Sequence, residues 1–185
     1  MKSSIYLASG FAIVGLLIGT AFGYYLTPEY KSTMYAEDMS LGNPGRSFDL
    51  RYINAMIAHH RGAMLLAEDL QANTSRAEMK ALATNILADE PKAIDELYTW
   101  KKSWYGDTRQ VKDPEVPNLG GADTNFDLRF LNAIIAHHEA GIEMTKEARS
   151  KSTRSQVLDN ANAVEAFLTE GLEALKGLRL NWYNI

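Results

Sequence analysis

The residues best suited to chemistry in this chain are its histidines, which form two adjacent pairs. The pairs are His59-His60 and His137-His138, 78 positions apart, and the chain has no other histidine. Three methionines lie within two helical turns of the pairs: Met56, Met64 and Met144. Imidazole nitrogen and thioether sulfur together suit copper, and thioether sulfur favours Cu(I). These residues are therefore candidate metal ligands, with copper as the candidate ion.

Helical spacing limits which of these side chains can share an ion. His60 lies four residues after Met56 and four before Met64, so either thioether can approach His60 within one turn. His137 and Met144 share a face but lie about 10 Å apart along a helix axis. Adjacent histidines point about 100° apart and do not easily chelate one ion. A good site would therefore combine histidines from two helices.

The same residues can also be explained without a metal. A neutral histidine on the apolar face of a helix can donate a hydrogen bond across the core to its counterpart or to a backbone carbonyl. Such a pair would fix the register of two helices. Methionine at helical spacing is commonly core filler. The sequence leaves both interpretations open.

The pairs belong to a tandem duplication. The string FDLRYINAMIAHHRGAM at 48–64 returns as FDLRFLNAIIAHHEAGIEM at 126–144, and Trp104-Tyr105 returns as Trp182-Tyr183. Apolar residues with helical period predict helices at about 49–70, 75–103, 127–150 and 153–180. Two such hairpins must pair to bury their apolar faces. We predict an all-α four-helix bundle over 48–185, with repeats about 48–105 and 126–183, whose pseudo-two-fold axis brings the two His-bearing helices together.

Three details of the helices can be tested directly. The apolar stripe of the third helix places His138 inward, and the fourth helix is expected to bury Phe167 and Leu168. Pro91 lies in the middle of the second helix, where it removes a backbone donor and would kink the helix.

The first residues of the chain predict a membrane anchor over 1–27. Residues 5–26 are uncharged, and about 20 apolar residues suffice to cross a bilayer as a helix. Lys2 precedes them, and Tyr24-Tyr25 lie where an interfacial aromatic belt would be. A cleaved secretory signal is the alternative, with Ala21-Phe22-Gly23 as its cleavage site. Residues 28–47 contain Pro28 and a Gly-Asn-Pro-Gly run, which predicts a linker.

The predicted anchor also suggests a location and a partner. One Lys ahead of the span and a long polar domain behind it predict a single-pass protein of a bacterial inner (cytoplasmic) membrane, with the bundle periplasmic or extracellular. Gly15, Gly19 and Gly23 recur on one helical face, where small residues let a partner helix in a membrane complex approach closely.

Composition and missing motifs exclude several functions. The 185 residues include 19 basic and 23 acidic side chains without a basic stripe, which argues against nucleic acid as a partner. The absence of Cys excludes disulfides and Cys-based metal sites. Ferritin-like di-iron sites need Glu-x-x-His, which is missing. His138-Glu139 begins like a zinc-protease motif, but Ile142 replaces its second His. We predict that the protein is not an enzyme.

The pattern F-x-x-x-M-I-x-H-H-x-x-A-x-x-M-A resembles the family called domain of unknown function 305, over residues 48–185. The resemblance implies a ferritin-like bundle in an exported bacterial protein, and some members are implicated in copper binding through His and Met. Each copy departs from the pattern at one methionine: Ile134 stands where copy one has Met56, and Leu66 where copy two has Met144. Glu90 stands near the acidic position of the second helix, whereas Leu168 occupies it in copy two.

Two functions fit these observations. The first is a membrane-anchored, extracytoplasmic copper-binding module that uses the His pairs with methionine support. The alternative is a structural accessory subunit of a bacterial membrane complex, for example respiratory or photosynthetic. In that case the bundle lies on the periplasmic face and the His pairs are structural.

Overall fold

The computed structural model describes residues 40–185, which form four helices. They are α2 (Phe48–Asn73), α3 (Ala77–Tyr105), α4 (Phe126–Lys151) and α5 (Ser155–Tyr183). Residues 40–185 contain no strand, so the all-α four-helix prediction is confirmed. The predicted anchor, with Gly15, Gly19 and Gly23, lies outside the described residues. Within the described part, no helix is both long and apolar enough to span a membrane.

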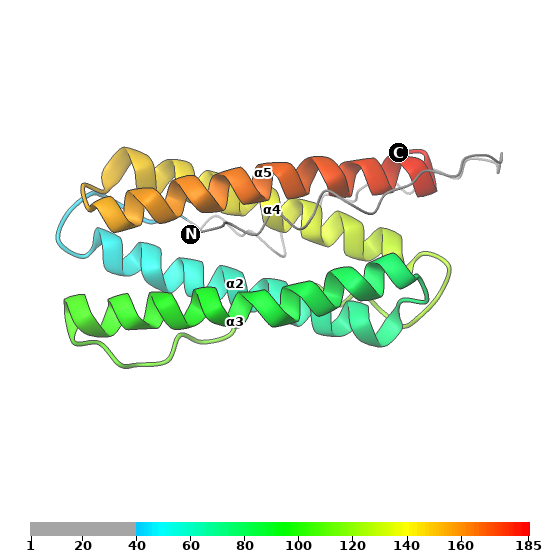
Figure 1. Cartoon of the computed structure of the whole chain (residues 1–185), viewed down its shortest axis with the longest axis horizontal. Coiled ribbons are helices and arrows are strands. Elements are labelled where there is room, and N and C mark those ends of the chain that lie inside the picture. Colours follow the sequence, from blue (N-terminus) through cyan, green and yellow to red (C-terminus); the bar gives the residue numbers. More distant parts are fainter. Residues whose placement is uncertain (1–39) are drawn as a thin grey trace, which may run out of the picture.

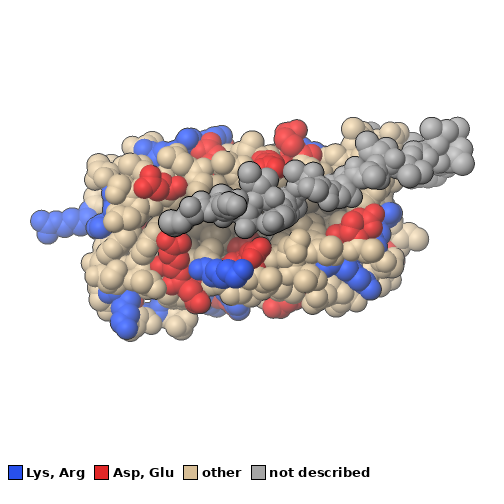
Figure 2. Space-filling view, in the orientation of Figure 1, with Lys and Arg blue, Asp and Glu red and all other residues tan. Residues whose placement is uncertain are grey.

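The helices form two hairpins that pack against each other. Within each hairpin the helices lie side by side, α2 with α3 and α4 with α5, and the hairpins meet along α2 and α4 (Figure 1). The predicted approach of the two His-bearing helices is therefore confirmed. α3 continues as a helix through Pro91. On the face shown in Figure 2, acidic and basic side chains are interspersed.

The duplication is visible as reciprocal contacts between the hairpins. Arg76 pairs with Asp127 at 3.1 Å, and its guanidinium lies 4.3 Å from the ring centre of Trp182. Its counterpart Arg154 pairs with Asp49 at 3.2 Å and covers the corresponding tryptophan at 4.2 Å. The arginine in the turn of each hairpin thus contacts the other hairpin at its open end, where its first helix begins and its second helix ends, through an ion pair and a cation–π contact.

The structural repeat begins before the helices. Leu41 and Leu119 are both buried, and each is followed by a glycine with φ near 75°. The carbonyl oxygen of Leu41 accepts a hydrogen bond from Arg51, and that of Leu119 accepts one from Arg129. The last residues of the predicted linker therefore pack on the bundle as residues 118–125 do.

The apolar core lies in two clusters, and the histidines separate them. Along α2, one cluster takes residues 48–57 and the other residues 66–70; along α4, the order of the clusters is reversed. His59 and His137 are buried, whereas His60 and His138 are half-buried, so the inward placement of His138 was wrong by one residue. Phe167, expected in the core, is 55% exposed. It lies next to the buried Leu168, which holds the inward position.

Candidate metal centre

His59 and His137, the inner pair, are stacked where α2 meets α4. Their ring centroids lie 3.8 Å apart with an interplanar angle of 31°. His59 Nε2 is 3.2 Å from the carbonyl oxygen of His137, and His137 Nε2 is 3.0 Å from the carbonyl oxygen of His59. Because a carbonyl only accepts, both Nε2 atoms carry the proton. These reciprocal hydrogen bonds fix the register of α2 against α4, the metal-free role that the sequence left open.

Burial keeps the inner pair neutral. His59 is 8% exposed and His137 is 5% exposed. Burial lowers the pKa of His137 to about 3 and moves the pKa of His59 well below its usual value. Both Nδ1 atoms are buried without a hydrogen-bond partner. Because carbonyl oxygens occupy both Nε2 atoms, only the two Nδ1 atoms of the inner pair have no partner.

This burial predicts how stability depends on pH. Unfolded histidines bind protons below a pKa of about 6.5, whereas the buried, neutral rings do not. The free energy of unfolding should therefore fall as the pH drops from about 6.5 towards 3, by up to about 1.4 kcal/mol per pH unit for each inner histidine. Urea titrations between pH 6.5 and 5 measure this slope before most carboxylates titrate. If the His59→Ala/His137→Ala variant showed the same dependence of unfolding free energy on pH as the wild type, the neutral, buried state assigned to the inner pair would be contradicted.

Glycine makes the close approach of the inner pair sterically feasible. A Cβ at Gly141 would lie 2.5 Å from His59 Nε2 and 2.5 Å from Leu168 Cδ1. On the other helix, a Cβ at Gly62 would lie 3.4 Å from His137 Nε2, an ordinary contact distance, so Gly141 is the glycine that the approach requires. Sequence reasoning missed the role of Gly141. The available signal was Gly141, which replaces Ala63 of copy one in an otherwise similar string.

His60 and His138, the outer pair, are hydrogen-bonded through Nδ1, whereas the inner pair is hydrogen-bonded through Nε2. His60 Nδ1 contacts a carboxylate oxygen of Glu90 on α3, and its Nε2 is buried without a partner. His138 Nδ1 lies 2.9 Å from the carbonyl oxygen of Ile134, so Nδ1 carries the proton. A Cβ at Gly171 of α5 would lie 2.9 Å from His138 Nε2, which therefore faces that helix. In both residues Nδ1 is hydrogen-bonded and Nε2 is left over.

The outer pair fits the chemistry of a metal ligand. Metal-binding histidines almost always donate their second ring N–H to a carboxylate, a carbonyl or water, which fixes the ring and raises its basicity. His60 meets this requirement through Glu90, and its orphaned Nε2 offers a lone pair. Copy two has no matching carboxylate, because Leu168 occupies the position of Glu90. The two copies therefore differ in this respect: a carboxylate orients the outer histidine of copy one but not that of copy two.

The methionines line the apolar cluster beside the histidines. Met56 and Met144 are almost fully buried in it, and Met64 is partly buried against it with its sulfur 4.0 Å from an Arg61 nitrogen. Among residues 40–185, no three His, Asp or Glu side chains are grouped so as to hold a metal ion. A site here would consequently depend on thioether sulfur as well as imidazole. The ring centroids of the two inner histidines lie 3.8 Å apart, whereas those of the adjacent histidines in each pair lie 6.0 and 6.2 Å apart.

The family described as "Domain of unknown function (DUF305)" matches residues 49–179. The chain belongs to this family. The resemblance read from the paired histidines is thereby confirmed. No curated protein sequence matches the chain significantly.

Solved structures of CopM are similar in fold to this DUF305 protein. The structure titled "CopM in the Cu(I)-bound form" is 26% identical with a TM-score of 0.65, covering 73% of this chain and 97% of that chain. The apo form of CopM is 27% identical with a TM-score of 0.64, covering 73% and 98%. The Cu(II)-bound form is 25% identical with a TM-score of 0.62, covering 73% and 97%.

Proposed function

We propose that this DUF305 protein is a non-enzymatic copper-binding module whose principal ligand is the Nε2 atom of His60. The observation that carries the proposal is the state of that side chain. Its Nδ1 is held by the Glu90 carboxylate, while its Nε2 is buried and has no partner. A buried imidazole nitrogen without a partner is costly unless something binds it. Binding of a soft cation to the Nε2 atom of His60 would remove that cost.

Thioether sulfur is available on both sides of His60. Met56 precedes it by one helical turn and Met64 follows it by one turn. Imidazole with thioether favours Cu(I) over harder cations. Similarity to CopM, solved in Cu(I)-, Cu(II)- and Ag-bound forms, supports the same class of ion. When bound, the ion would be held as Cu(I) for storage or transfer.

The inner pair has a different role in this proposal. Its reciprocal hydrogen bonds fix α2 against α4, whereas His60 is oriented within its own hairpin by Glu90 of α3. His138 with Met144 forms the weaker counterpart, because no carboxylate orients His138. We therefore expect copy one to bind copper more tightly than copy two.

The uncharged stretch at residues 5–26 supports attachment of the module to a bacterial inner membrane, with the bundle outside the cytoplasm. The alternative function, an accessory subunit of a membrane complex, is favoured by the inner pair, which uses two of the four histidines without any metal. Gly15, Gly19 and Gly23 would then contact a partner helix. Extraction with mild detergent distinguishes the two functions. If the protein is extracted together with stoichiometric companion proteins, the accessory-subunit function is favoured; if it is extracted alone, the copper-binding module is favoured.

Copper binding is tested by titrating the full chain in detergent with Cu(I) against a chromophoric chelator. The wild-type chain should take up Cu(I) stoichiometrically. Glu90→Gln removes the charge behind His60 and should weaken binding about 10- to 100-fold, the usual effect of losing such a partner. His60→Ala should weaken it at least as much. Glu96→Gln, on the exposed face of α3, is the matched control and should bind normally. Wild-type affinity in the His60→Ala variant would refute the assignment.

A further inference from the structure

The outer histidines of the two copies differ in the partner that their Nδ1 atom takes. His60 Nδ1 contacts the carboxylate of Glu90 on the neighbouring helix, α3. His138 Nδ1 instead donates to the carbonyl oxygen of Ile134, one turn earlier on its own helix, at 2.9 Å. Two rings at equivalent positions of the duplication therefore take different orientations.

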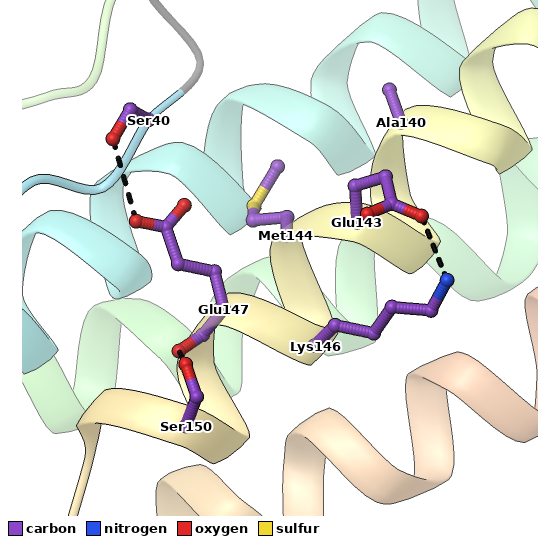
Figure 3. Close-up of a pocket in the computed structure, with 7 residues that line it drawn as sticks. All are labelled: Ser40, Ala140, Glu143, Met144, Lys146, Glu147 and Ser150. Carbon is purple, nitrogen blue, oxygen red and sulfur yellow. Dashed lines mark hydrogen bonds and ion pairs between the residues drawn. The ribbon is translucent and has the colours of Figure 1, made fainter.

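The orientation of His138 requires glycine on the helix that the ring faces. A Cβ at Gly171 of α5 would lie 2.9 Å from His138 Nε2 and 3.1 Å from its Cδ2. Non-bonded heavy atoms prefer separations of about 3.5–4.0 Å, so the ring and a Cβ could not both keep these positions. The pocket on α4 is lined by Ala140, Met144 and later residues of that helix together with Ser40 (Figure 3), and His138 is not among them. The His138 ring packs on α5 instead.

The duplication places an alanine where copy two has this glycine. The bounds of α3 and α5 differ by 78 residues at both ends, as do those of α2 and α4. At the same offset, Ala93 of α3 corresponds to Gly171 of α5, and His60 corresponds to His138. A His60 ring turned as the His138 ring is would therefore collide with the Cβ of Ala93.

We propose that the Cβ of Ala93 positions His60 by excluding the orientation that His138 adopts. In the excluded orientation Nδ1 would donate to the carbonyl oxygen one turn earlier, as it does in His138. With that orientation blocked, Nδ1 of His60 contacts Glu90, and Nε2 is left buried without a partner. The role of Ala93 rests on the proposed function, in which His60 is the principal copper ligand.

Ala93→Gly tests this role, because it removes the blocking carbon and gives copy one the residue of copy two. Nuclear Overhauser effects are measured in the metal-free full chain in detergent, between the ring protons of His60 and the α-protons of position 93. His138 and Gly171 supply the reference signal in the same sample. In Ala93→Gly the His60 signals should become comparable to that reference, and those between His60 and the side chain of Glu90 should be lost.

Two further variants separate the steric effect from the loss of helix propensity. Ala88→Gly, at an exposed position of α3, carries the same propensity cost and should leave the His60 signals unchanged. Ala93→Ser keeps a Cβ and should hold His60 against Glu90 as in the wild type. If His60 remains against Glu90 in Ala93→Gly, Glu90 alone orients the ring and the proposed role of Ala93 is overturned.

Copper binding shows separately whether the orientation of His60 matters for function. Cu(I) affinity should fall roughly ten-fold in Ala93→Gly, because Nε2 is unavailable in part of the population and the carboxylate behind the ring is lost. Ala88→Gly and Ala93→Ser should bind Cu(I) as the wild type does. A turned His60 ring with unchanged Cu(I) affinity would refute His60 as the principal ligand, and with it the proposed function, while the steric role of Ala93 would stand.

Discussion

Gly141→Ala is expected to destabilise the bundle by about 2–4 kcal/mol, even though it replaces glycine inside a helix with the best helix former. The new Cβ would lie 2.5 Å from both His59 Nε2 and Leu168 Cδ1, so both buried side chains must move. Displacing His59 also breaks its hydrogen bond to the carbonyl oxygen of His137. The steric cost exceeds the gain of about 1 kcal/mol in helix propensity.

Gly177→Ala is the matched control for that substitution. A Cβ at Gly177, inside α5, would meet no atom within 4 Å. Only the propensity effect remains, so stability should rise by about 0.5–1 kcal/mol. Urea unfolding followed by circular dichroism measures both variants. Equal stability of Gly141→Ala and wild type would show that the inner pair does not need the glycine.

His137→Ala is expected to cost about 2–4 kcal/mol of stability and to leave Cu(I) binding at copy one intact. The substitution removes a buried ring stacked on His59 and leaves the carbonyl oxygen of His59 without that donor. The principal copper ligand in our proposal is His60, which the substitution does not touch.

His138→Ala, at the neighbouring position, is the control for His137→Ala. This ring is half-buried and makes no contact across the pseudo-two-fold axis comparable to that of His137, so its loss should destabilise the bundle less. Thermal unfolding and Cu(I) titration are measured on both variants. If His137→Ala abolished copper binding at unchanged stability, the roles assigned to the inner and outer pairs would be reversed.

Most of the fold could be predicted from the sequence because its determinants are repeated and periodic. The apolar period placed all four helices, and the duplication required two hairpins related by a pseudo-two-fold axis. Periodicity could not decide which histidine of each adjacent pair lies inward, because neighbouring residues differ by only about 100° around a helix. In the structure the inward His59 lies against Gly141, where a Cβ would be 2.5 Å from its Nε2, a contact that periodicity does not reveal.

The candidate site was predicted less completely than the fold. The sequence identified the His pairs and placed Glu90 near an acidic position of the family, but it could not show that Glu90 contacts His60. That contact joins two helices and depends on how α2 and α3 pack. Likewise, helical spacing suggested that histidines from two helices would combine, and His59 and His137 do meet. Their Nε2 atoms, however, are occupied by carbonyl oxygens, a contact that involves the backbone and leaves no trace in residue spacing.

The division of the histidines into a structural inner pair and a copper-binding outer pair is tested most directly by ¹⁵N NMR of histidine-labelled full-length protein. Only four imidazoles contribute signals. Without metal, His59 and His137 should show the Nε2–H tautomer, and His60 and His138 the Nδ1–H tautomer. Stoichiometric Cu(I) should then shift the Nε2 signal of His60 and leave the inner pair unchanged. An unshifted His60, or copper-dependent shifts confined to His59 and His137, would contradict the proposed site.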